Sequence, residues 1–104
     1  MTGKSDGAVL VVDDNAYVLE SVSVLLGGSG FSVVSSMSAE QALDKLKAQK
    51  FDAVLTDIKM PGMTGIDLLR EAHAANPNIP VILMTAYAEM DLAVDAVKQG
   101  AFDF

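Results

Sequence analysis

The sequence contains no cysteine and only one histidine among its 104 residues. The absence of cysteine excludes a disulfide, a thiolate nucleophile and a cysteine-ligated metal ion. The one histidine, His73, falls on a predicted helix, and a metal-binding histidine needs partner ligands nearby. We therefore expect the His73 side chain to lie on a solvated helix surface and to take no part in a metal site.

Basic residues are also scarce. The sequence has 7 lysines and arginines against 14 aspartates and glutamates, which gives a formal net charge of −7. This balance argues against direct contact with nucleic acid or an anionic membrane, since both need a basic face. No apolar run approaches the roughly 18 residues of a membrane-spanning helix, and residues 1–7 lack the apolar stretch of a signal peptide. We expect a cytoplasmic protein with a flexible tail over residues 1–7 and one domain over residues 8–104.

Three apolar runs end at residues that carry side-chain oxygens. Runs of this kind are typical of strands that are covered on both faces of a parallel sheet. The carboxyl ends of parallel strands lie at one edge of the sheet, so these polar residues are expected to form one site. The runs are residues 8–12 followed by Asp13 and Asp14, residues 51–57 ending in Asp57, and residues 81–84 followed by Thr85.

Segments with helical spacing of apolar residues alternate with these strands. The first begins at Asn15, and the glycine-rich residues 27–30 are expected to end it. Residues 27–30 could also form a phosphate-binding loop, but such a loop precedes its helix, whereas this one follows. The apolar residues that fall at helical spacing are Val18, Leu19, Val22, Leu25 and Leu26.

Other local signals complete the pattern. Strand and helix alternate four times, which predicts an α/β fold with a doubly wound parallel sheet and helices on both of its faces. The signals are a more polar edge strand at residues 31–34, a capping box of Ser38 with Gln41, a weaker cap of Thr64 with Asp67, a helix stop at Asn76 and Pro77, and a last helix that Gly100 ends before a fifth strand.

The residues expected at the sheet edge include three carboxylates. Two like charges about 4 Å apart repel by roughly 4 kcal/mol at an effective dielectric constant of about 20, so either one carboxylate is protonated or a cation joins them. An all-oxygen set suits Mg²⁺, which keeps several waters and often binds phosphate as well. Asp57, alone at the end of a central strand, is the predicted nucleophile for forming an aspartyl phosphate. The Thr85 hydroxyl is placed to bond a phosphoryl oxygen.

Each of these residues also has an ordinary structural interpretation. An Asp-Asp-Asn run before a helix is often a cap that compensates the helix dipole. Asp57, shortly before Pro61 and Gly62, is equally typical of a turn. Thr85 by itself is more typical of a strand end or a cap. It is the combination of these residues that favours a site for a metal ion and a phosphoryl group.

Four stretches carry a family resemblance: VVDDN at residues 11–15, DIKMPG at 57–62 with Gly65, VILMTA at 81–86 and GAFDF at 100–104. Together they resemble the receiver domain of two-component response regulators over nearly the whole chain from Ala8. The stretch from Ala86 onward is most similar to receivers of the nitrogen-regulation type. The resemblance implies a flavodoxin-like strand order of 2-1-3-4-5 in a three-layer sandwich.

The resemblance also implies roles for single residues. Asp57 would accept a phosphoryl group from a phosphohistidine on a sensor histidine kinase or a phosphotransfer protein. Asp13, Asp14, Asp57 and the backbone carbonyl of Lys59 would hold Mg²⁺. The chain would be a self-phosphorylating and self-dephosphorylating switch at most, not an enzyme. The other implied site positions are Thr85, which moves to the phosphoryl group, Phe104 as the switch aromatic, the small Ala86 beside the phosphoryl group, and Lys59 and Tyr87, which tune dephosphorylation.

The implied output surface covers residues 89–104, where phosphorylation would change the affinity for an output domain, a partner protein or a second receiver. The sequence stops at Phe104, before the lysine, the proline and the last helix of the family pattern. We therefore expect a truncated form or a fragment that lacks the last helix. A homodimer or an exchange of elements is expected to cover the apolar strand face left open, and Lys59 is expected to replace the missing lysine in part.

Two other functions are weighed against the phosphoacceptor switch. A Mg²⁺-dependent phosphohydrolase would use Asp57 as its nucleophile, but the sequence offers no second acid–base carboxylate near it; repeated turnover of a phosphate ester would support this function. A pseudo-receiver would act through protein contacts without phosphorylation. The missing lysine favours it and the complete acidic set opposes it, and a Mg²⁺ titration separates the two.

Overall fold

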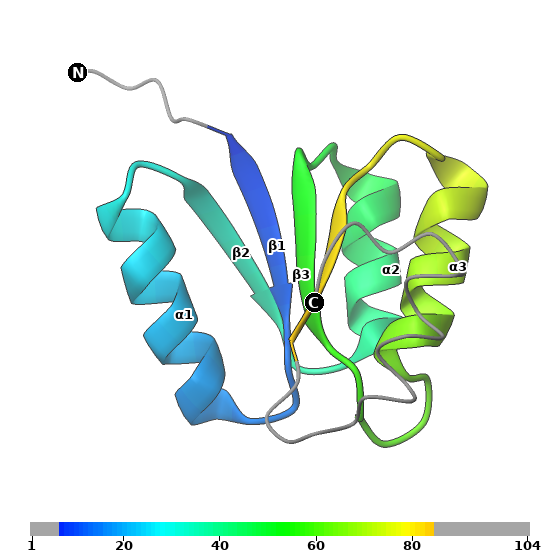
Figure 1. Cartoon of the computed structure of the whole chain (residues 1–104), viewed down its shortest axis with the longest axis horizontal. Coiled ribbons are helices and arrows are strands. Elements are labelled where there is room, and N and C mark those ends of the chain that lie inside the picture. Colours follow the sequence, from blue (N-terminus) through cyan, green and yellow to red (C-terminus); the bar gives the residue numbers. More distant parts are fainter. Residues whose placement is uncertain (1–6, 85–104) are drawn as a thin grey trace.

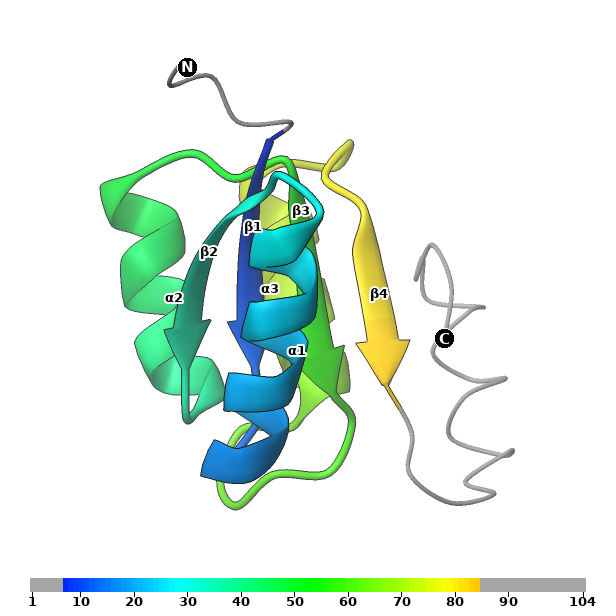
Figure 2. The same cartoon turned by 90° about the vertical axis from the view of Figure 1, so that its left-hand side faces the viewer.

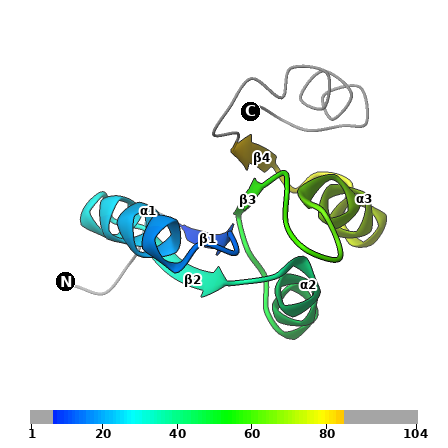
Figure 3. The same cartoon turned by 90° about the horizontal axis from the view of Figure 1, so that it is seen from below.

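The structure, a computed structural model, describes residues 7–84. Four parallel strands form one sheet in the order β2-β1-β3-β4 (Figure 1). Helix α1 covers one face of this sheet, and α2 and α3 cover the other (Figure 3). The predicted α/β class, strand order and two-sided helical cover are therefore confirmed, while the predicted fourth helix and fifth strand lie outside the described residues. The elements are β1 (Ala8–Val12), α1 (Ala16–Gly28), β2 (Ser32–Ser36), α2 (Ala39–Ala48), β3 (Ala53–Asp57), α3 (Gly65–Ala75) and β4 (Val81–Met84).

The position of strand β1 between two layers of helices explains why its sequence contains no polar residue. Its side chains alternate between two apolar clusters, one under α1 and one under α2 and α3. Val9 and Val11 pack with Leu19 of α1, whereas Leu10 and Val12 join the larger cluster. A strand buried on both faces cannot alternate polar and apolar residues, so the uninterrupted run marks the centre of the sheet.

Strand β2 forms an edge of the described sheet, as its polar composition predicts (Figure 2). It pairs with β1 from Ala8 opposite Ser32 to Val12 opposite Ser36. The predicted strand at residues 31–34 therefore begins one residue too early and ends two residues too soon. Hydrogen bonding to β1 extends the strand through two serines that composition alone would assign to a loop.

Helix α1 buries a narrower stripe than its sequence predicts. Leu19 is buried and Val18, Val22 and Leu26 are partly buried, but Leu25 is 71% exposed. Leu25 is exposed because it lies about 120° around the helix from Leu19, beyond the buried stripe. The helix ends at Gly28, within the glycine-rich segment, so the helix-stop interpretation of residues 27–30 is confirmed.

Side-chain caps begin the other two helices. Ser38 caps α2 by accepting a hydrogen bond from the backbone N–H of Gln41 at 3.1 Å. Thr64 and Asp67 form a complete reciprocal capping box on α3, stronger than the weak cap predicted there. The hydrogen bonds from Thr64 hold the pKa of Asp67 below its usual value. Helix α3 ends at Ala75, before Asn76, as the following proline predicts.

His73 departs from the prediction of a solvated surface residue. Its side chain is partly buried, and Nε2 lies 2.9 Å from the backbone carbonyl oxygen of Ile79. The imidazole thereby ties α3 to the segment that leads into β4. This contact depends on how the chain turns back after α3, which the local pattern around residue 73 does not specify.

No helix within residues 7–84 has the length and apolar character needed to cross a membrane.

Candidate functional site

Three acidic side chains meet at the carboxyl edge of the sheet. Asp13 and Asp14 follow β1, and Asp57 is the last residue of the neighbouring strand β3, with Val12 paired opposite Thr56. One carboxylate oxygen from each of the three lies within 4.8 Å of the others. The structure thus brings together the three acidic residues that the sequence pattern selected, from positions far apart in the chain.

The sequence around Asp13 fixes where its carboxylate lies. The Asp13 backbone N–H donates to the carbonyl of Ser36 at 3.1 Å, which continues the β1–β2 pairing. Its Oδ1 accepts a hydrogen bond from the N–H of Asn15 at 2.9 Å. The N-cap of α1 is Asn15, whose side chain accepts from Tyr17 and Val18. The helix cap is therefore made by Asn15, and the Asp13 and Asp14 side chains are not used as the cap.

Two neighbours of Asp57 that sequence reasoning gave no role hold its backbone. The Thr56 hydroxyl, fully buried, donates to the Asp57 carbonyl oxygen at 2.9 Å. Gly65, the first residue of α3, donates its N–H to the Ile58 carbonyl at 2.8 Å. A Cβ atom at position 65 would overlap the Asp57 carbonyl oxygen. Only glycine lets the start of α3 approach Asp57 this closely. The one sign of this role in the sequence was that Gly65 belongs to a stretch that carries the family resemblance.

The loop between β3 and α3 is held from a third direction by α2. Gly62 has a φ of 77°, a left-handed conformation that favours glycine. The next residue, Met63, donates its N–H to the Glu40 carboxylate at 3.3 Å. Met60 is buried in the core, whereas the Lys59 side chain is exposed. Contacts to α2 and to the core thus constrain the loop that carries the Lys59 carbonyl.

Burial and repulsion between the carboxylates raise the pKa of two of them, Asp13 and Asp57. Burial is the main cause that raises the pKa of Asp13, with a smaller contribution from the Asp14 charge, against the lowering effect of the Asn15 N–H. Burial also raises the pKa of Asp57, and the Asp13 charge adds to this effect, while the backbone N–H groups of Ile58 and Lys59 act in the opposite direction. Clustered, partly desolvated carboxylates of this kind fit a hard divalent cation such as Mg²⁺.

The raised pKa of Asp57 gives a prediction for stability. A carboxyl whose pKa is higher in the folded than in the unfolded chain destabilises the fold when it is ionised. Asp57→Asn is therefore expected to raise the thermal midpoint at pH 7 without divalent cations. This gain should shrink as the pH falls through the raised pKa and disappear below the unfolded value of 3.8. Thermal unfolding of both proteins from pH 7 to 3.5 measures it, and a gain independent of pH would contradict the electrostatic cause.

The remaining predicted site residues lie outside the described residues. These are Thr85, Ala86, Tyr87 and Phe104, together with the output surface at residues 89–104. Their expected roles rest on the sequence alone. Within residues 7–84, the cluster of Asp13, Asp14 and Asp57 is the one group of acidic or histidine side chains arranged to hold a metal ion.

Comparison with known proteins agrees with this arrangement. The chain is 45% identical over 96 residues to the transcriptional regulatory protein ZraR of Escherichia coli, which covers 92% of this chain and 22% of ZraR. It is 40% identical over 98 residues to the DNA-binding transcriptional regulator NtrC of Klebsiella pneumoniae, covering 94% of this chain and 21% of NtrC. The chain thus spans about a fifth of the length of these relatives.

The fold gives the same result. A crystal structure of a response regulator receiver domain protein from Clostridium thermocellum superposes with a TM-score of 0.88 at 35% identity, covering 92% of this chain and 78% of that one. The sequence profile of the response regulator receiver domain matches residues 9–104. Neither the phosphohydrolase nor the pseudo-receiver interpretation is favoured by these matches. The chain belongs to the response regulator receiver domain family and is a signalling domain of a bacterial-type two-component system.

Proposed function

We propose that Asp57 of this chain is the phosphoacceptor and that Asp13, Asp14, Asp57 and the Lys59 backbone carbonyl hold Mg²⁺. The observation that carries the proposal is the meeting of three carboxylates within 4.8 Å at the end of β1 and β3. In the transfer, an Asp57 carboxylate oxygen forms a bond to phosphorus while the phosphorus–nitrogen bond of a kinase phosphohistidine breaks, and the histidine leaves. Bound Mg²⁺ would offset the negative charge gathered there.

The residues around Asp57 orient the attacking oxygen. Thr56 and the start of α3 fix the backbone of Asp57, and the N–H groups of Ile58 and Lys59 face its carboxylate. By resemblance to the family, Thr85 bonds the phosphoryl oxygens and Ala86 leaves room beside them. Phe104 is the switch aromatic, and Lys59 tunes the rate at which phosphorylated Asp57 loses its phosphoryl group.

Intact-protein mass spectrometry tests this function. The chain is incubated with Mg²⁺ and acetyl phosphate, a small donor that replaces the kinase. We expect a gain of one phosphoryl group, and no gain when EDTA removes the metal. A folded chain that gains no phosphoryl group under these conditions would contradict the proposal. Turnover of more than one equivalent of a phosphate ester, offered in place of acetyl phosphate, would favour a phosphohydrolase instead.

The metal ligands give a further prediction. Asp13→Asn removes a buried ligand charge but keeps the oxygen that accepts from Asn15. We expect it to weaken Mg²⁺ binding by about tenfold or more, measured by calorimetric titration. Asp44→Asn, an exposed change of the same charge on α2, is the matched control and should leave the affinity unchanged. Equal affinities of the two variants would exclude Asp13 as a ligand.

The longer context of the chain follows from its relatives. Because ZraR and NtrC are named as transcriptional regulators, we propose that this receiver controls transcription through a further domain. We expect DNA contact to be made by that further domain, because the net charge of −7 argues against direct DNA binding by this chain. The proposed partners are a sensor histidine kinase or phosphotransfer protein and an output domain on residues 89–104, in the cytoplasm. A homodimer or an exchange of elements is also proposed, and a sedimentation profile that stays monomeric at all concentrations would exclude it.

A further inference from the structure

The loop between β3 and α3 is anchored at its two ends but is exposed at its turn. The Ile58 carbonyl accepts a hydrogen bond from the N–H of Gly65 at 2.8 Å, and the side chains of Ile58 and Met60 are buried in the core. Between these anchors, Pro61 and Gly62 form an exposed turn. The position of this turn therefore depends on contacts that come from outside the loop.

Glu40, in the first turn of α2, supplies such a contact. Its carboxylate accepts a hydrogen bond from the Met63 N–H at 3.3 Å, from a position 23 residues earlier in the chain. A Cβ atom added at Gly62 would lie 2.9 Å from the same Oε2 atom of Glu40. Since Gly62 also has a φ of 77°, its lack of a side chain permits both the backbone conformation and the approach of the carboxylate. Glu40 thus contacts two successive residues of the loop.

The same loop carries the Lys59 carbonyl, a ligand of the proposed Mg²⁺ site, and the inference below rests on that proposed site. A backbone carbonyl cannot be redirected by rotating a side chain, so its direction follows from the backbone angles of the loop. A loop that is already held in its binding shape loses less conformational freedom when the metal binds. The affinity for the metal falls with the fraction of molecules whose loop has another shape. A contact at Met63 can therefore change the affinity of a site to which Met63 contributes no ligand.

We propose that Glu40 is a positioning residue for Mg²⁺. By accepting the hydrogen bond from the Met63 N–H, it keeps the β3–α3 loop in the shape that offers the Lys59 carbonyl to the metal. Glu40 is exposed, and the group of carboxylates arranged to hold a metal ion in the described part of the chain does not include it. It acts on the affinity for Mg²⁺ through the loop and takes no part in the formation of the bond to phosphorus.

Calorimetric titration of the full chain with Mg²⁺ tests the proposal. Glu40→Ala removes the acceptor, and we expect the affinity to fall about threefold to tenfold, as for the loss of one hydrogen bond. Glu40→Gln keeps an oxygen that can accept from Met63 and should restore most of the affinity. Parent-like affinity of Glu40→Ala would overturn the proposal, as would a Glu40→Gln variant that binds as weakly as Glu40→Ala.

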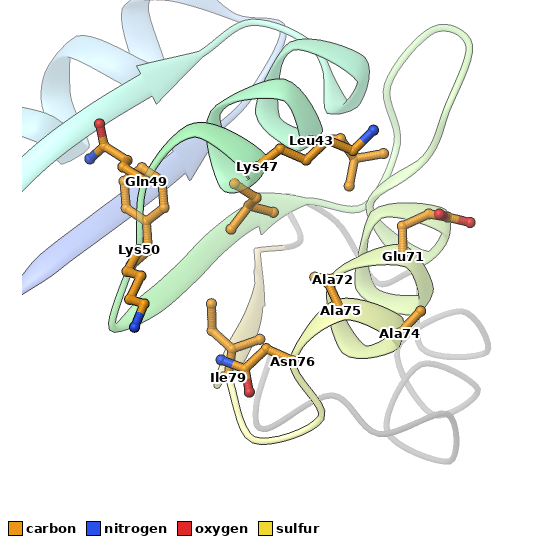
Figure 4. Close-up of a pocket in the computed structure, with 12 residues that line it drawn as sticks. Leu43, Lys47, Gln49, Lys50, Glu71, Ala72, Ala74, Ala75, Asn76 and Ile79 are labelled. Atoms are coloured by element: carbon orange, nitrogen blue, oxygen red, sulfur yellow. The ribbon is translucent and has the colours of Figure 1, made fainter.

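Glu71→Ala is the matched control for the lost charge. Glu71 is an exposed glutamate of α3 that lines the groove between the carboxyl ends of α2 and α3 (Figure 4). Its removal lowers the negative charge of the chain by the same amount without removing the acceptor of the Met63 N–H. Glu71→Ala should bind Mg²⁺ like the parent, and an equal loss of affinity in Glu71→Ala and Glu40→Ala would overturn the proposal in favour of a general effect of charge.

Amide hydrogen exchange in the metal-free chain separates positioning from a loss of stability. In Glu40→Ala the Met63 amide should exchange about threefold to tenfold faster than in the parent. The Gly65 amide, which donates to the Ile58 carbonyl, should exchange as in the parent. Equal acceleration at both amides would show a general loss of stability and would contradict the proposal.

The kinetics of phosphorylation by acetyl phosphate give a further distinction. In Glu40→Ala the Mg²⁺ concentration for half-maximal rate should rise by the same factor as the dissociation constant, while the rate at saturating Mg²⁺ stays that of the parent. A lower saturating rate would contradict a role limited to metal affinity. If the parent binds Mg²⁺ but gains no phosphoryl group, the proposed phosphoacceptor function fails, and the affinities and amide exchange still decide the role of Glu40. A parent that does not bind Mg²⁺ would overturn both proposals.

Discussion

Asp57→Asn is expected to reduce the Mg²⁺-dependent gain of a phosphoryl group from acetyl phosphate to below detection. The neutral amide oxygen is a much weaker nucleophile than a carboxylate, and the amide also removes one of the three negative charges that draw in the metal. Neither other carboxylate of the cluster is placed to substitute for it. Asp13 is 6% exposed and its Oδ1 already accepts a hydrogen bond from Asn15, and Asp14 is an exposed residue beyond the end of β1.

The chemistry of the product adds a second measurement. An aspartyl phosphate is an acyl phosphate, so hydroxylamine should remove the added mass, whereas a phosphate ester on serine or threonine would persist. Asp44→Asn is the control of equal charge and should be phosphorylated like the parent. Retention of the full phosphoryl gain in Asp57→Asn would show that another residue is the acceptor. Since this variant is also expected to be more stable than the parent without metal, a loss of phosphorylation could not be assigned to unfolding.

Gly65→Ala is expected to be the most damaging single methyl addition in the described part of the chain. The new Cβ would overlap the Asp57 carbonyl oxygen and would lie 3.0 Å from both the Asp57 carbonyl carbon and the Ile58 Cα. These are backbone atoms of a central strand end, and they cannot rotate away as a side chain can. We expect the free energy of unfolding to fall by about 3 kcal/mol or more, measured as a lower urea midpoint with an unchanged slope.

The same substitution should also damage the site. To relieve the overlap, the start of α3 must move away from β3, which breaks the hydrogen bond from Gly65 N–H to the Ile58 carbonyl. The loop that carries Lys59 would move with it, so Mg²⁺ affinity should fall in the fraction that remains folded. Gly27→Ala is the matched control, since a Cβ there meets nothing within 4 Å. This control should be stabilised by about 0.5–1 kcal/mol, and a similar gain for Gly65→Ala would show that α3 does not pack on β3 as described.

The sequence by itself determined the parts of the molecule that depend on neighbouring residues. The unbroken apolar run of β1 placed it inside the sheet, and the serines of β2 placed that strand at an edge. Ser38, Thr64 and Asn76 marked helix ends through hydrogen bonds or backbone restrictions that act within a few residues. The three aspartates were identified because the ends of parallel strands must share an edge, so their position in the alternating pattern was sufficient.

Only the tertiary structure decided contacts between residues far apart in the chain. The positions of the helices on the sheet determine three such features. These are the exposure of Leu25, the hydrogen bond between His73 and the Ile79 carbonyl, and the hydrogen bond from the Met63 N–H to Glu40. The same is true of Gly65, whose lack of a side chain matters because Asp57 lies directly against it. Periodicity specifies which face of an element is apolar, but the distance between two packed elements is set by all the side chains between them. For this reason the sequence was enough to select Asp57 as the predicted nucleophile, whereas the structure was needed to show which contacts fix its backbone.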